Sequence, residues 1–335
     1  MMDQFVVFAA IGLLALAIFL YVLLDGYSLG IGILFPFIRS QDDRSLMLNT
    51  VAPLWDGNQT WLVFGAAILY ACFPKAYAGL LTKLYSPVFL MLVALVFRGV
   101  TFEFKHKEKK YPLIWDGTFF FAAFFAAFFQ GLILGAFITG HEVFIHDGEM
   151  SKLSWLTPFT LITGISVVCG YALLGTGWLI YKTEGDLQRK MRSLSKLFLV
   201  CVGIAMFVVS IYTPLSHPDI AHRWFSWPNI VILAPLPTLT GLSCLYLWHL
   251  LSSDDDKQVF FVMMLIFLCG FIGLGVGIWP YIIPRTMTFF DAAASPKTIK
   301  FVLAFAMVSF PLLLAYTVHA YYVFRGKIKD EDGYH

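Results

Sequence analysis

The stretch Trp55-Asp56-Gly57-Asn58-Gln59-Thr60-Trp61 places one acid and two carboxamides directly before an apolar run that continues from Leu62 to Phe73. The block and the run together are about as long as one membrane helix, so the polar block falls in the first turns of that helix. Acidic and amide side chains at such a depth are costly, and they mark a functional path or a packed subunit interior. The alternative is an N-terminal cap flanked by interfacial tryptophans. The residues alone leave both interpretations open.

Composition indicates the class of protein. Apolar residues make up 59% of the 335 residues and charged residues only 13%, whereas soluble domains carry about 25% charged residues. Apolar runs of about 20 residues recur along the whole length, which predicts an all-α integral membrane protein forming a single polytopic membrane domain over residues 1–335. A transmembrane β-barrel would alternate apolar and polar residues, and the run from Phe119 to Phe129 does not. The net charge of +2 gives no indication of nucleic-acid binding.

Nine transmembrane helices are expected. The first is expected to be retained and not cleaved as a signal peptide, because no basic residue precedes its apolar run. It exceeds one crossing of about 20 residues, so we expect it to tilt or bend near Gly26-Tyr27-Ser28-Leu29-Gly30 and to end near Pro36. The expected ranges are about 5–37, 53–73, 77–101, 114–140, 156–181, 195–213, 228–250, 258–283 and 298–324.

The distribution of basic residues predicts the orientation. Fifteen lysines and arginines lie in connections on one side of the predicted helices, and five lie in connections on the other. Cytoplasmic loops are enriched in these residues, so the N-terminus is expected outside and the C-terminus inside. Asp25, Asp56, Arg98 and Asp116, from four consecutive helices, then fall at one level on the inner side of the membrane.

This set of three acids and one arginine suggests two roles. In partly dry surroundings it can relay protons, or it can only lock helices together. Asn58, Gln59 and Gln130 are placed to extend a hydrogen-bonded path outward. The eight histidines and five cysteines show no metal-site spacing and no pair placed as facing haem ligands. We therefore expect no catalytic residue, metal or cofactor bound by this chain alone.

Three further blocks are interpreted structurally. Asp254-Asp255-Asp256 is expected to be a solvated loop, and Gly273 to Pro284 a structural cap with interfacial aromatics. Trp115-Asp116-Gly117 repeats Trp55-Asp56-Gly57. The repeat is either a remnant of duplication or interface chemistry used twice, and we favour the second.

Several blocks together resemble subunit II of cytochrome bd-type ubiquinol oxidases, and the resemblance covers essentially the whole chain. The compact length is more similar to the cyanide-insensitive branch than to the longer enterobacterial form. The blocks are Asp25-Gly26-Tyr27-Ser28-Leu29-Gly30-Ile31-Gly32, Trp55-Asp56-Gly57-Asn58-Gln59, Phe97-Arg98-Gly99, Trp279-Pro280-Tyr281 through Pro284, and Ala294-Ser295-Pro296-Lys297-Thr298.

The resemblance implies a role and an architecture. It implies two four-helix bundles plus a peripheral helix, in a multi-pass protein of the bacterial cytoplasmic (inner) membrane. The chain would be a haem-free subunit packed against a larger subunit I, which carries haem b and haem d and oxidises quinol while dioxygen is reduced to water. The resemblance also leaves room for a structural ubiquinone, an oxygen route and a small accessory single-helix subunit.

The resemblance also ranks the buried polar residues. It makes Asp56 the first candidate for a cytoplasmic proton route and Asp25 the second, with Asn58 and Gln59 beside them. Arg98 becomes an ion-pair partner, and Asp116 is a further candidate for ion pairing. Many members have an acid where this chain has Ser28, so Arg98 must here pair with Asp25, Asp56 or another group.

Two other hypotheses remain. A proton-coupled secondary transporter would use the same acids around a midplane site, but these acids lie toward one face. A purely structural membrane subunit would use them only to fix helix packing.

Overall fold

The computed structural model describes residues 2–105, 111–140, 154–216, 218–253 and 255–328. Helices dominate it, as the composition predicts, and the all-α class is confirmed apart from one short hairpin. The helices are α1 (Met2–Leu34), η1 (Phe35–Phe37), α2 (Gln41–Asn49), α3 (Trp55–Cys72), α4 (Pro74–Lys105), α5 (Pro112–Thr139), α7 (Pro158–Lys182), α8 (Gly185–Ser216), α9 (Pro218–Phe225), α10 (Asn229–Leu233), α11 (Pro235–Leu250), α12 (Val259–Ile278), α13 (Phe289–Ala292) and α14 (Pro296–Val323); the strands are β1 (Tyr281–Ile283) and β2 (Met287–Thr288).

Eight helical segments in the described part of the chain are long and apolar enough to cross a membrane. They are α1 with η1, α4, α5, α7, α8, α10 with α11, α12, and α14. The expected ninth, α3, has 18 residues, but its polar first two turns lower its mean hydropathy. A ninth crossing by α3 therefore stays a prediction.

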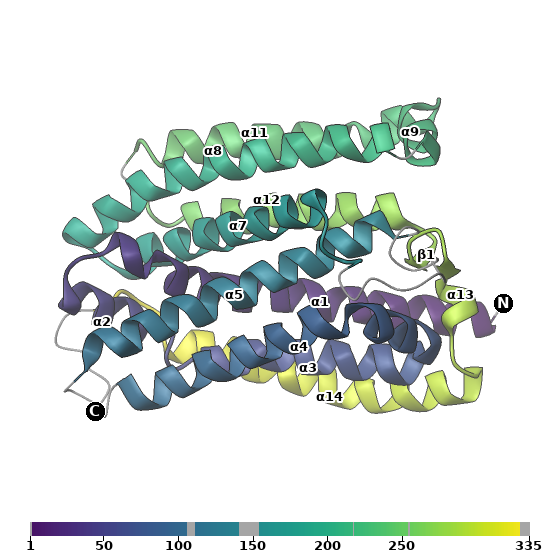
Figure 1. Cartoon of the computed structure of the whole chain (residues 1–335), viewed down its shortest axis with the longest axis horizontal. Coiled ribbons are helices and arrows are strands. Elements are labelled where there is room, and N and C mark those ends of the chain that lie inside the picture. Colours follow the sequence, from purple (N-terminus) through teal and green to yellow (C-terminus); the bar gives the residue numbers. More distant parts are fainter. Residues whose placement is uncertain (1, 106–110, 141–153, 217, 254, 329–335) are drawn as a thin grey trace.

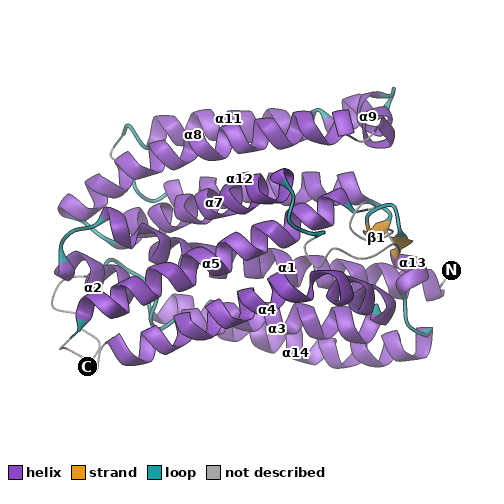
Figure 2. Cartoon of the chain, viewed as in Figure 1, coloured by secondary structure: helices purple, strands orange, loops and turns teal. Residues whose placement is uncertain are grey.

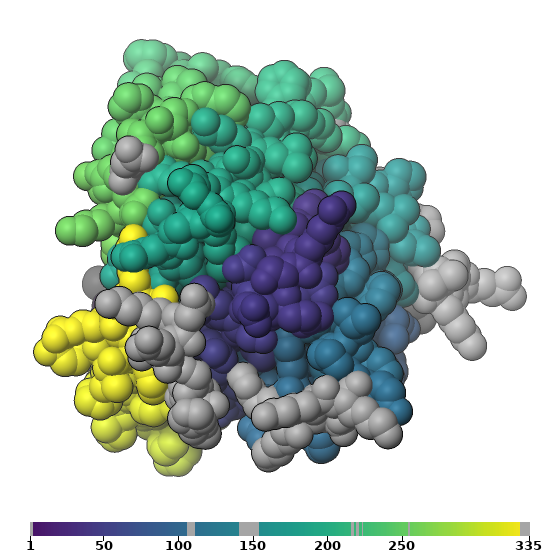
Figure 3. Space-filling model, turned by 90° about the vertical axis from the view of Figure 1, so that its left-hand side faces the viewer, coloured from purple at the N-terminus to yellow at the C-terminus, as the bar shows by residue number. Residues whose placement is uncertain are grey.

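The long helices run along one common direction and stack in layers (Figure 1). Helix α1 lies inside the molecule and packs against α3, α5 and α7. Helices α8 and α11 form the outermost layer on one side, and α14 lies beside α3 on the other (Figure 1). Short connections join the helices at both ends of the stack (Figure 2), and the start of α1 and the end of α14 lie at opposite ends (Figure 1). Seen end-on, the purple segment that contains α2 lies between the teal helices and the blue helices (Figure 3).

Two predicted helix boundaries were wrong. Helix α8 begins at Gly185 and not near 195, so the basic segment expected as a loop is helical. Helix α12 ends at Ile278 and not near 283. Pro280 has no N–H to continue the helix, and Tyr281–Ile283 instead pairs antiparallel with Met287–Thr288.

Glycines bring α1 and α7 into backbone contact. A Cβ atom at Gly30 would lie 1.8 Å from the carbonyl oxygen of Tyr171, and a Cβ at Gly175 would lie 2.6 Å from the carbonyl carbon of Gly30. Small residues permit such close approach of membrane helices. Helix α1 stays helical through this region and ends at Leu34, just before Pro36 in η1.

Candidate proton-route site

An ion pair without solvent exposure connects α1 with α4. Nη1 of Arg98 lies 2.6 Å from Oδ1 of Asp25, and both side chains are 0% exposed. Nη2 of Arg98 donates to Oε1 of Gln59 on α3 at 3.1 Å. The three side chains join three different helices, and Asp25, not Asp56, is the acid that pairs with Arg98.

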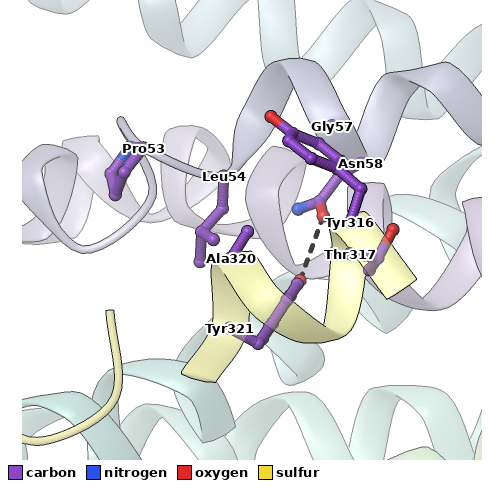
Figure 4. A pocket seen from close by; sticks show the side chains of 8 residues that line it. All are labelled: Pro53, Leu54, Gly57, Asn58, Tyr316, Thr317, Ala320 and Tyr321. Atoms are coloured by element: carbon purple, nitrogen blue, oxygen red, sulfur yellow. Dashed lines mark hydrogen bonds between the residues drawn. The ribbon is translucent and has the colours of Figure 1, made fainter. Parts of the chain in front are cut away.

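Asn58 is the centre of a second group of hydrogen bonds. Its amide nitrogen donates to the carbonyl oxygen of Leu24 at 2.9 Å and to the Tyr27 hydroxyl at 3.1 Å. Its amide oxygen accepts from the Tyr321 hydroxyl at 3.1 Å (Figure 4), and the two tyrosine hydroxyls lie 2.7 Å apart. Asn58 therefore ties α3 to α1 and to α14.

A small pocket lies beside Asn58, between α3 and α14 (Figure 4). Its volume is about 10 Å³, which is close to the space that one water molecule needs. The lining residues are Pro53, Leu54, Gly57, Asn58, Tyr316, Thr317, Ala320 and Tyr321. The absence of a side chain at Gly57 leaves room for the ring of Tyr316, which would lie 3.1 Å from a Cβ there.

Asp56, the first-ranked acid, lies on the surface. Its side chain is exposed, and its carboxylate forms no ion pair or hydrogen bond with any residue that the structure describes. Asp56 does not cap α3 either, because the N-cap residue is Leu54 and makes no side-chain cap bond. The next turn of the same helix contains Gln59, which contacts Arg98, so Asp56 lies one turn away from the buried ion pair.

Asp116 belongs to a separate group of charges. It pairs with Arg44 at 2.9 Å and with Lys105 at 2.5 Å, and it accepts a hydrogen bond from Gln41 at 2.9 Å. These partners come from α2 and from the last residue of α4, and none of them contacts Asp25. The four charges predicted at one level thus divide into a buried pair, a second cluster and an exposed acid.

Gln130 lies in a third hydrogen-bonded group, which connects α5 with α1 and α7. Its amide nitrogen donates to the Tyr21 hydroxyl at 2.8 Å, and its amide oxygen accepts from the Tyr171 hydroxyl at 2.7 Å. The tyrosines were not among the predicted residues, because nothing local in an apolar run shows which tyrosine finds a polar partner. Their spacing gives one signal, since Tyr21 precedes Asp25 by one helical turn on α1.

The acidic turn before α12 is more than a solvated loop, so that prediction was wrong for Asp256. Asp256 forms an ion pair with Arg192, another with Lys327 at 3.1 Å, and a hydrogen bond with Gln188 at 2.8 Å. Partial burial raises the pKa of this carboxyl group, but the hydrogen bonds from Arg192, Lys327 and Gln188 outweigh burial and hold the pKa below its ordinary value. Asp254 lies outside the described residues.

A second unpredicted contact holds the end of α14. Lys182 is only 2% exposed, and its ammonium group donates to the carbonyl oxygens of Phe324 and Gly326. Together with the ion pairs of Asp256, this contact attaches the segment after α14 to α7 and α8.

The described residues contain no group of three or more His, Cys, Asp or Glu side chains able to hold a metal ion. His106, His141, His146, His217 and His335 lie outside the described residues. The geometry therefore offers hydrogen-bonded carboxylate, amide and hydroxyl groups, which suit proton transfer or helix locking.

The chain is similar in sequence and in fold to known proteins. It is 28% identical to cytochrome bd-I ubiquinol oxidase subunit 2 of Escherichia coli (strain K12), over 92% of this chain and 91% of that protein. It is 24% identical to cytochrome bd ubiquinol oxidase subunit 2 of Bacillus subtilis (strain 168), over 92% and 93%. Its fold is similar to a chain of the bd oxidase from Geobacillus thermodenitrificans, with a TM-score of 0.77 and 15% identity, over 96% of this chain and 99% of that chain.

The likeness to one protein family extends over nearly the whole sequence. Residues 6–324 match the family described as cytochrome bd terminal oxidase subunit II. The match includes α1, α3 and α4, which carry the Asp25–Arg98–Gln59 contacts. The chain therefore belongs to the cytochrome bd terminal oxidase subunit II family.

Proposed function

We propose that this chain is the haem-free subunit II of a membrane-bound quinol oxidase and contributes part of a cytoplasmic proton route. It packs against a larger subunit I, which carries haems b and d, oxidises quinol and reduces dioxygen to water. The family match over residues 6–324 supports the complex. A structural ubiquinone, a small accessory subunit and membership of the cyanide-insensitive branch stay predictions.

The proposed topology has nine crossings in a bacterial cytoplasmic membrane, arranged as two four-helix bundles plus peripheral α14. The N-terminus lies outside and the C-terminus inside. The basic residues Arg44, Lys105, Arg192 and Lys327, which pair with Asp116 and Asp256, support this orientation, because all four belong to the set that is predicted on the inner side. Only 6% of the most apolar 18-residue stretch of α14 is buried, which supports a place at the periphery for this helix.

The proposed route starts at the exposed carboxylate of Asp56 and ends at the buried carboxylate of Asp25. Gln59, one turn along α3 from Asp56, contacts Arg98, which in turn contacts Asp25. Asn58, from the same turn, lies beside the pocket of about 10 Å³. The single observation that carries the proposal is the place of an exposed acid one helical turn from Gln59, whose contact with Arg98 leads to an acid with 0% exposure.

The complex can be tested by purification. The chain is tagged at its C-terminus, expressed with its whole operon, and extracted in mild detergent. We expect a larger partner and a reduced-minus-oxidised visible spectrum with haem b and haem d bands, whereas the chain expressed alone is colourless. A colourless preparation without a partner, or haem bands in the isolated chain, would overturn this assignment.

A further inference from the structure

Tyr21, Gln130 and Tyr171 form a hydrogen-bonded chain between α1, α5 and α7. The two tyrosines are 4% and 3% exposed. The Tyr171 hydroxyl lies 2.7 Å from Oε1 of Gln130, and Nε2 of Gln130 lies 2.8 Å from the Tyr21 hydroxyl. It lies inside the helix stack and takes no part in the route proposed above.

The chemistry of the amide gives this chain a direction. An amide oxygen only accepts hydrogen bonds and an amide nitrogen only donates them. Tyr171 therefore donates its proton to Oε1 of Gln130, and the Tyr21 oxygen accepts from Nε2. The hydroxyl proton of Tyr21 is consequently left to donate to another group.

Asp25 lies on the same face of α1 as Tyr21, because Tyr21 precedes it by one helical turn. Oδ1 of Asp25 is held by Arg98, whereas Oδ2 is buried and has no hydrogen bond of normal geometry with the described residues. The oxygen that lacks a bond and the hydroxyl with a proton to donate thus belong to neighbouring side chains.

We propose that Tyr171, Gln130 and Tyr21 are positioning residues for Asp25. Tyr171 donates to Gln130, Gln130 donates to Tyr21, and Tyr21 donates to the Asp25 carboxylate and favours its ionised form. A hydrogen bond donated to a carboxylate stabilises the charged state, so the chain keeps Asp25 ready to accept a proton. This inference rests on the proposed function, since it gives the innermost acid of the route its proton-accepting form. The charged and titratable groups that interact with Asp25 are Arg98, Tyr21, Tyr27, Tyr171 and Tyr321.

The test uses the assembled oxidase with Tyr21→Phe, which removes the hydroxyl and keeps the ring. Tyr181→Phe on α7 is the matched control, because Tyr181 makes ring contacts with Trp178 and Phe261 and does not belong to the chain. Infrared difference spectra are recorded across pH, and the protonated-carboxyl band of Asp25 is assigned by its loss in Asp25→Asn. If Asp25→Asn does not assemble, Asp25→Glu assigns the band through its change of frequency.

In Tyr21→Phe we expect the protonated-carboxyl band to persist to a pH about one unit higher than in the native complex, because a hydrogen bond to a charged group is lost. Tyr171→Phe, which frees the amide of Gln130, should shift the titration in the same direction by less. A titration in Tyr21→Phe that coincides with that of Tyr181→Phe would overturn the inference. The opposite amide orientation, in which Tyr21 donates to Gln130, gives the same overturning result.

The proton route and the effect of Tyr21 on Asp25 are tested by different measurements, so one can be wrong while the other holds. If Asp25→Asn assembles and turns over at the native rate, the proton route is wrong. The infrared titration still reports whether Tyr21 acts on Asp25.

Discussion

Asp25 and Arg98 contact one another at 2.6 Å in a place where neither side chain reaches solvent. Removing one partner of such a pair leaves a buried charge without compensation, whereas removing both is often nearly neutral. The pair connects α1 with α4, and Gln59 adds α3 to the same group. It therefore contributes both to the packing of the helices and to the proposed route.

A double-mutant cycle measures the coupling free energy between Asp25 and Arg98. Asp25→Leu alone should lower the stability of the complex by about 3–5 kcal/mol, because the Arg98 charge stays buried. Adding Arg98→Leu should recover most of that loss. Thermal unfolding in detergent measures all four members of the cycle. A double variant at least as unstable as the single one would show that the two charges are not coupled.

The close contact of α1 and α7 predicts a steric effect. Gly30→Ala places a methyl group where the Tyr171 carbonyl oxygen lies 1.8 Å away, so we expect a loss of about 1–3 kcal/mol or failure to assemble. Gly12→Ala on the same helix is the control, because nothing lies within 4 Å of a Cβ there. Equal unfolding temperatures for the two variants would contradict the backbone contact.

The cluster around Asp116 predicts a local loss of stability. Asp116→Asn removes the charge that holds Arg44 and Lys105, and we expect a cost of about 2 kcal/mol from weakened charge-assisted hydrogen bonds. Asp42→Asn is the control, because Asp42 lies exposed on α2 in the same region. Chemical unfolding of the complex compares the two. The account of this cluster fails if both substitutions are neutral.

Asp256 predicts a pH dependence. Its pKa is lower in the folded protein than the ordinary value of 3.8, so its contribution to stability is fully present above pH 3.8 and is lost as the pH falls through the lower folded value. The stability difference between the native complex and Asp256→Asn should therefore be constant near neutral pH and shrink below about pH 4. Unfolding temperatures measured against pH test this. A stability difference between the two proteins that grows as the pH falls would contradict this prediction.

The sequence predicted the class and most helices, because the run of about 20 apolar residues that a membrane helix needs is a local signal. It did not distinguish the two Trp-Asp-Gly blocks. Asp56 is exposed and Asp116 is buried, and the difference arises from Arg44 and Lys105, which reach Asp116 from other segments. Helix α2 was missed because it is short and polar.

Position along each helix predicts one membrane level for the four charges, but it does not determine which face of the helix each charge occupies. That face decides whether an acid meets Arg98, meets Lys105 or faces away from the chain. Asp256 shows the same effect in a connection, because its partners Arg192 and Lys327 are distant in sequence.

The most direct test of the proton route is proton uptake by the reduced complex with Asp56→Asn after mixing with dioxygen, followed with a pH-indicator dye. Asp56 is exposed, and its carboxylate forms no ion pair or hydrogen bond with the described residues, so this substitution should leave assembly and the haem spectrum intact. We predict slower proton uptake and slower quinol-dependent oxygen consumption, with Asp42→Asn unchanged. Native rates in Asp56→Asn, with a normal haem spectrum, would contradict the route through this chain.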